Sequence, residues 1–84
     1  MKIVFAERGW EDFSYWLEND RKIAARIVRL IREIERSPFE GLGKPEPLRH
    51  DLAGFWSRRI TEERRFVYAV DDDRVLIAQA RYHY

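Results

Sequence analysis

The hydrophobic pattern of this chain changes its period sharply at a loop rich in glycine and proline. Over residues 23–34, isoleucine and leucine recur at spacings of three and four, which predicts the buried face of a helix. Residues 39–47 contain two glycines and two prolines and predict an ordered loop. Beyond this loop the apolar residues fall in short runs that are typical of strands. Such a chain is expected to pack a helical layer against a sheet.

The pattern also predicts where most elements begin and end. Trp10, Phe13 and Trp16 share the spacing of a first helix and are expected to face the core. Asp20 can cap a second helix, which ends near Ser37 because the residue before a proline avoids the helical conformation. Strands are predicted over residues 2–5, 55–60, 65–70 and 74–82, the last three as an antiparallel meander. The predicted fold is a single α+β domain over residues 1–84, with two N-terminal helices on one face of a twisted, mainly antiparallel sheet.

Composition narrows the function classes. With 16 basic and 15 acidic residues in 84, a formal net charge of +1 excludes binding of nucleic acid by bulk charge alone. Any cationic surface must therefore be assembled locally by the fold. The chain has no cysteine, which excludes disulfides, thiolate zinc sites and cysteine nucleophiles. The N-terminal segment does not resemble a signal peptide, and no apolar run is long enough for a membrane span, so a cytoplasmic protein is expected.

Several arginines interrupt the apolar strands. In a sheet with one buried face the side chains alternate, so some of these arginines are expected to line the open face together. The alternative interpretation is that they are solvated strand-edge residues that deter aggregation. The residues are Arg58, Arg59, Arg64, Arg65 and Arg81.

Few other residues offer chemistry. The acidic run 71–73 lies in a predicted hairpin turn, where aspartate is favoured by turn geometry rather than by a metal. His50 is expected at the start of a short strand and is interpreted as structural or solvent-facing. His83 is penultimate, but it continues an apolar strand, and the sheet is expected to order it.

These residues match the needs of RNA cleavage without a metal. A base must accept the ribose 2′-hydroxyl proton, cations must stabilise the charged phosphorane, and an acid must protonate the 5′-oxygen. Glu46, held between two prolines, is a candidate base; Arg59 and Arg65 are candidate phosphate clamps; His83 is a candidate acid. A solvated loop carboxylate, solvated arginines and an ordinary strand end remain the structural alternatives.

Strand register decides which terminal residues join Arg65. If residues 71–73 form a three-residue loop, Arg65 shares a face with Arg81 and His83. If the loop has two residues, Arg65 shares its face with Tyr82 and Tyr84. The sequence leaves both registers open.

Four stretches together resemble the YoeB toxins, the Txe/YoeB group of the RelE-like superfamily. The match covers essentially the whole chain without insertions. The stretches that carry it are 37–48 (Ser-Pro-Phe-Glu-Gly-Leu-Gly-Lys-Pro-Glu-Pro-Leu), 54–63 (Gly-Phe-Trp-Ser-Arg-Arg-Ile-Thr-Glu-Glu), 65–68 (Arg-Phe-Val-Tyr) and 81–84 (Arg-Tyr-His-Tyr). The resemblance implies a microbial-RNase-like fold. It also implies a ribosome-dependent mRNA endonuclease of a type II toxin–antitoxin module, which cuts the codon in the A site, needs no cofactor and leaves a 2′,3′-cyclic phosphate and a 5′-hydroxyl.

The resemblance also implies roles residue by residue. Glu46 corresponds to the general base, His83 to the general acid, Arg65 to the arginine that stabilises phosphate charge, and Tyr84 to the terminal tyrosine that positions the substrate. The expected RNA-contacting residues are Lys44, Arg49, where relatives often carry lysine, and Arg59.

Expected partners follow from the same resemblance. They are mRNA and the ribosome, a cognate antitoxin with an acidic segment, and a second copy of the chain in a homodimer. The alternative functions are a module of the same fold that binds RNA or the ribosome without cutting, and a structural partner protein that pairs through its aromatic residues.

Overall fold

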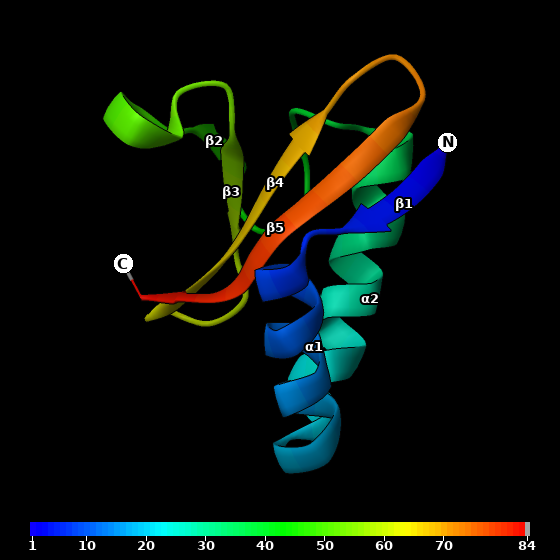
Figure 1. The fold of residues 1–84 in the computed structure, drawn as a ribbon, viewed down its shortest axis with the longest axis vertical. Helices are drawn as coiled ribbons and strands as arrows, with labels where there is room; N and C mark the ends of the chain where they lie inside the picture. Colours follow the sequence, from blue (N-terminus) through cyan, green and yellow to red (C-terminus); the bar gives the residue numbers. More distant parts are fainter. Residues whose placement is uncertain (84) are drawn as a thin grey trace.

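The structure, a computed structural model, describes residues 1–83 and is drawn in Figure 1. The sheet has the order β1-β5-β4-β3-β2, in which β1 pairs with β5 in parallel and every other pairing is antiparallel. The predicted two-helix, mainly antiparallel α+β fold is therefore confirmed. In chain order the elements are β1 (Lys2–Phe5), α1 (Glu7–Asn19), α2 (Arg21–Arg36), β2 (Glu46–Pro47), the 3₁₀-helix η1 (His50–Leu52), β3 (Trp56–Arg59), β4 (Arg64–Val70) and β5 (Arg74–His83).

Both helices cover the same face of the sheet. Asp20 caps α2, because its side chain accepts hydrogen bonds from the backbone amides of Lys22 and Ile23. The apolar stripe of α2 packs against β4 and β5 in one core, and Phe66 and Tyr68 of β4 are fully buried there. Because side chains alternate along a strand, Arg65 and Val67 must lie on the opposite face, which the helices leave open.

The first helix lies very close to β5. A β-carbon built on Gly9 would come within 2.3 Å of the carbonyl oxygen of Ile77, so only glycine allows this approach. Trp16 is buried as predicted, with an exposed fraction of 9%, and Phe13 is partly buried against the core. The prediction for Trp10 was wrong: it is 54% exposed, because it packs on the rim with Phe5 rather than under the sheet.

Arg58 departs from the expectation of a solvated strand arginine. Its side chain lies on the helix-covered face and is fully buried. Its guanidinium donates to the Tyr68 hydroxyl and to the backbone carbonyls of Ser37, Glu40 and Leu42. These bonds attach the loop after α2 to the sheet, and that loop leads directly into β2.

The hairpin between β4 and β5 has a two-residue loop. The amide of Asp71 donates to the carbonyl of Arg74 at 3.1 Å, which leaves only two residues between them. The register then shifts by one residue at two places along β5. Two shifts of one residue preserve which residues share a side, so Tyr82 lies opposite Arg65 and His83 lies opposite Arg64. The two-residue loop and the shared face of Arg65 and Tyr82 are thus observed, whereas the predicted position of Tyr84 lies outside the described residues.

His50 does not begin a strand. It is the first residue of η1 and has a φ of 58°. No helix among residues 1–83 has the length and apolar character needed to cross a membrane.

Candidate active site

The open face of the sheet brings three of the predicted residues together. Glu46 of β2 lies opposite Ser57 of β3, and Arg59 of β3 lies opposite Arg65 of β4. Residues two apart in a strand face the same way, so Ser57 and Arg59 share one side of the sheet. Directly paired residues also share a side, which adds Glu46 to this group. Of the five strand arginines, Arg59 and Arg65 are therefore the two that line this face together.

Glu46 and Arg65 form the central ion pair of this face. The distance from Arg65 Nη1 to Glu46 Oε1 is 3.0 Å. The Arg65 side chain is only 3% exposed, whereas the Glu46 side chain is 48% exposed. The sheet thus fixes the guanidinium in place, while the carboxylate reaches solvent and can meet a ligand. A charge-assisted bond to a buried guanidinium also orients the carboxylate.

Neighbouring side chains on the open face are covered although no helix lies there. Ser57 and Val67 are both fully buried, and the Ser57 hydroxyl has no hydrogen-bond partner among residues 1–83. A buried hydroxyl without a partner is uncommon and is often a place where a ligand or water completes the bonding. Sequence reasoning missed Ser57, although its position one residue before the arginine pair of β3 was a usable signal.

Lys44 and Arg49 flank Glu46 along the chain. Lys44 precedes β2 in the left-handed region with a φ of 51°, next to Gly43 with a φ of 88°. Arg49 follows β2 and lines a cavity of about 320 Å³ together with Glu46. Both cations are exposed, so they lie where an RNA strand crossing Glu46 could meet them.

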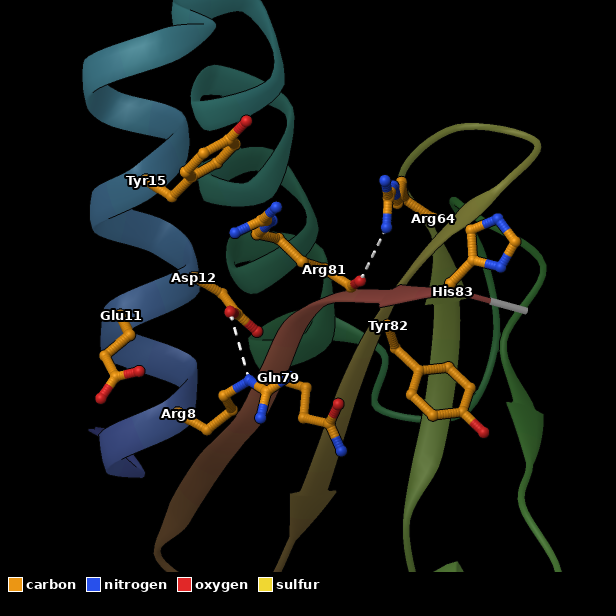
Figure 2. A pocket seen from close by; sticks show the side chains of 9 residues that line it. All are labelled: Arg8, Glu11, Asp12, Tyr15, Arg64, Gln79, Arg81, Tyr82 and His83. Atoms are coloured by element: carbon orange, nitrogen blue, oxygen red, sulfur yellow. Dashed lines mark hydrogen bonds and ion pairs between the residues drawn. The ribbon is translucent and has the colours of Figure 1, made fainter.

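His83 lies on the other side of β5 from Arg65. It pairs in register with Arg64, and its Nε2 lies 4.0 Å from Glu63 Oε2. Figure 2 shows the rings of His83 and Tyr82 leaving β5 on opposite sides. The structure thus places His83 at the strand end but not beside Glu46, and Tyr84 lies outside the described residues.

A second hollow lies between α1 and the end of β5, and both Tyr82 and His83 are among its lining residues. It has a volume of about 720 Å³, and Figure 2 shows the Arg81 guanidinium reaching toward Tyr15, whose ring centre is 3.6 Å from Arg81 Cζ. Arg64 donates to the Arg81 carbonyl there. The lining mixes both charges and contains an ion pair of its own, between Arg8 Nε and Asp12 Oδ1 at 3.5 Å. In that pair the carboxylate is buried and the guanidinium is exposed, which is the reverse of the Glu46–Arg65 pair.

The aspartates 71–73 behave as turn residues. Asp71 accepts a hydrogen bond from Arg74 Nε at 2.9 Å, and this bond lowers the pKa of the Asp71 carboxyl. Across residues 1–83 no three histidine, aspartate or glutamate side chains gather in a way that could hold a metal ion.

The open face therefore offers a half-exposed carboxylate held by an immobile guanidinium, a second arginine beside it and further cations at its edge. A carboxylate can accept a proton from a hydroxyl, and a forked guanidinium matches the oxygens of a phosphate. Phosphodiester chemistry is the reaction class that uses both.

Comparison with known proteins identifies the family. A model of the YoeB-like toxin of bacterial type II toxin–antitoxin systems matches residues 5–84. The chain belongs to the YoeB toxin family. It is 60% identical over 84 residues to the protein named Toxin YoeB of Escherichia coli strain K12, with all of both chains covered.

Solved structures of YoeB proteins agree closely with this fold. A YoeB/ParE toxin from Agrobacterium tumefaciens is 49% identical and superposes with a TM-score of 0.95 over all of both chains. A YoeB dimer from Staphylococcus aureus is 44% identical, with a TM-score of 0.94, all of this chain and 98% of that chain covered. A heterotetrameric YoeB–YefM toxin–antitoxin complex from the same organism has a TM-score of 0.91 at 44% identity and the same coverage.

Proposed function

We propose that this YoeB-family toxin is a ribosome-dependent endoribonuclease that cleaves mRNA in the ribosomal A site and so inhibits translation. The observation that carries the proposal is the ion pair between Glu46 and the buried Arg65 on the open face of the sheet. A half-exposed carboxylate held against a guanidinium is suited to a reaction that moves a proton next to a phosphate.

The proposed chemistry begins with Glu46 as the general base. Glu46 accepts the proton of the 2′-hydroxyl, whose oxygen attacks the adjacent phosphorus and displaces the 5′-oxygen. Arg65 and Arg59 stabilise the charge that develops on the phosphate oxygens. Glu46 keeps the proton of the 2′-hydroxyl, and the departing 5′-oxygen takes a proton from the general acid, so the products are a 2′,3′-cyclic phosphate and a 5′-hydroxyl. None of these reaction steps requires a metal cofactor.

His83 is the proposed general acid. In an in-line displacement the attacking and leaving oxygens lie on opposite sides of phosphorus, so the base and the acid approach from opposite sides. At the end of β5, Glu46 and Arg65 lie on one side of the strand and His83 lies on the other, so a phosphate bound beside the strand end could be approached from both sides. Tyr84 is proposed to position the substrate, and Lys44 and Arg49 to contact the RNA backbone.

The test is cleavage of mRNA on programmed ribosomes by the wild type and by Glu46→Gln, which keeps the shape of the side chain without its charge. We expect at least about a 100-fold loss of rate, because the general base is removed. Glu40→Gln is the matched control, since Glu40 is an exposed carboxylate of the preceding loop. Full cleavage by Glu46→Gln would refute the assignment. Intact mRNA with ribosomes occupied by the wild type would instead favour the non-cleaving binding module.

We also propose its partners and location. The solved relatives include a YoeB dimer and a YoeB–YefM complex, which supports a homodimer and a cognate antitoxin for this chain. An acidic segment of the antitoxin would complement the arginines of the open face. Action on ribosomes places the toxin in the cytoplasm.

A further inference from the structure

We propose that Tyr82 forms the platform on which a base of the RNA substrate stacks, beside the Glu46–Arg65 pair. This assignment rests on the proposed function and names a substrate contact that function leaves open. It is built on three observations: the face on which Tyr82 lies, the contacts that hold it there, and the absence of any hydrogen bond or ring contact to Tyr82 among residues 1–83.

The register places Tyr82 on the candidate active face. Tyr82 lies directly opposite Arg65 in the antiparallel pair of β4 and β5. Paired residues have β-carbons about 5 Å apart on the same side of the sheet, so the ring emerges next to the guanidinium that holds Glu46. Figure 2 shows this ring directed away from Arg81 and His83.

Two side chains of α1 hold this orientation. Ala80 lies where β5 contains one residue more than β4, so its backbone groups turn from β4 toward α1. The Ala80 amide donates to Asp12 Oδ2 at 2.9 Å, and its carbonyl accepts from Trp16 Nε1 at 2.8 Å. Both bonds are buried, so the irregularity is fixed, and with it the side on which Tyr82 emerges.

The Tyr82 side chain makes no directional contact within the described residues. Among residues 1–83 it forms no hydrogen bond and no ring contact, although it is only partly exposed. Tyr15, in contrast, stacks against the Arg81 guanidinium. The Tyr68 hydroxyl accepts a hydrogen bond from Arg58 and donates one to the Pro38 carbonyl. An aromatic ring with no hydrogen bond or ring contact among residues 1–83, next to the Arg65 guanidinium, fits a nucleobase, since every base offers a π face to an aromatic side chain.

The experiment measures cleavage on programmed ribosomes with two messages, one intact and one with abasic nucleotides in the A-site codon. For the intact message we expect Tyr82→Phe to keep kcat/KM within about twofold. Tyr82→Leu should lower it by about 5-fold to 150-fold, the range of one lost base–aromatic stack. The abasic message should slow the wild type similarly and slow Tyr82→Leu no further, because the same contact is then already missing.

The control is Tyr15→Leu, an aromatic removed from the helix side of β5, which should leave kcat/KM unchanged. Additive effects of Tyr82→Leu and the abasic message would overturn the proposal, because a purely structural role predicts additivity. Equal losses in Tyr82→Phe and Tyr82→Leu would overturn it as well, since they would assign the role to the hydroxyl.

A binding measurement separates this proposal from the cleavage mechanism. It uses ribosomes whose A-site codon carries 2′-methoxy groups, which cannot attack the phosphate. Weaker binding of Tyr82→Leu than of the wild type supports the stacking role, whether or not the wild type cleaves mRNA. A wild type that binds but does not cleave contradicts only the proposed function. Equal binding of the two proteins contradicts the stacking role.

Discussion

Arg58 shows how one buried side chain can position a loop. Its guanidinium is fully buried, and among the described residues no carboxylate lies within ion-pair distance of it. Three backbone carbonyls and the Tyr68 hydroxyl accept its hydrogen bonds instead, and the Tyr68 hydroxyl donates a hydrogen bond to the carbonyl of Pro38. Buried polar groups that are all hydrogen-bonded make a rigid network. The loop before Glu46 therefore begins from a fixed point.

Tyr68 gives this network a dependence on alkaline pH. Burial raises the pKa of the Tyr68 hydroxyl above its usual 10.0, and the hydrogen bond from Arg58 only partly opposes this effect. Above pH 10 the unfolded chain loses the proton before the folded chain does, so the free energy of unfolding falls as the pH rises. The slope from this one proton is at most about 1.4 kcal/mol per pH unit.

Urea unfolding at a series of pH values from about 8 to about 11 measures this slope. Tyr68→Phe removes the proton, so its stability should fall less steeply above pH 10, even though the variant starts out less stable. Parallel curves for the two proteins would show that Tyr68 does not contribute.

Single residues were the least predictable scale. Glu46 and Arg65 stood out in the sequence by type and neighbourhood, and the sheet brings them to 3.0 Å. The burial of Arg58 could not be foreseen, because alternation says which residues share a face but not which face the helices cover. Trp10 was misassigned for a related reason. The spacing of apolar residues along a helix is the same at the rim of the core as at its centre, so spacing alone does not give the depth of burial.

At the level of elements, α1 acts on β5 through Asp12. Replacing Asp12 with leucine leaves the buried Ala80 amide without its acceptor, which should cost about 1–3 kcal/mol. Pairing Ala80 with β4 again would relieve that cost and bring residue 81, rather than Tyr82, opposite Arg65. Asp12→Asn keeps an acceptor oxygen at the same position, so it should keep the native register.

Cross-strand NMR contacts of Arg65 distinguish the two registers. We expect contacts with residue 82 in the wild type and in Asp12→Asn, and contacts with residue 81 in Asp12→Leu. An unshifted register in Asp12→Leu would mean that Trp16 alone maintains the irregularity through the Ala80 carbonyl.

Helices and long strands were predictable because each carries its own periodic signal. The α2 stripe, the Asp20 cap and the stop before Pro38 all act locally and match the observed Arg21–Arg36. The two-residue β2, the helix η1 and the irregular pairing of β5 carry no such signal. They depend on what a distant element offers, as α1 does for Ala80, and periodicity along one chain segment does not contain that information.

For the molecule as a whole, a net charge of +1 means that RNA affinity must come from a few local cations. For a single strand, the logarithm of the binding constant falls with the logarithm of salt concentration by about 0.7 per phosphate neutralised. Arg49→Gln should therefore flatten this slope by about 0.7. Arg32→Gln, on the exposed side of α2, should leave it unchanged, because α2 covers the opposite face of the sheet.

Fluorescence anisotropy of a labelled, fully 2′-methoxylated RNA oligonucleotide at several salt concentrations measures both slopes. If Arg32→Gln flattens the slope and Arg49→Gln does not, the RNA lies over the helices, and the open face is not its binding surface.

The doubly shifted pairing of β5 limits how this segment can evolve. Adding or deleting one residue between the Asp71 turn and Tyr82 exchanges the two sides of everything downstream, so the phenol and the imidazole would trade places. A change of two residues preserves both sides. Homologues should therefore vary in length here by even numbers, or carry one more or one fewer irregularity in the pairing of β4 and β5 when the change is odd.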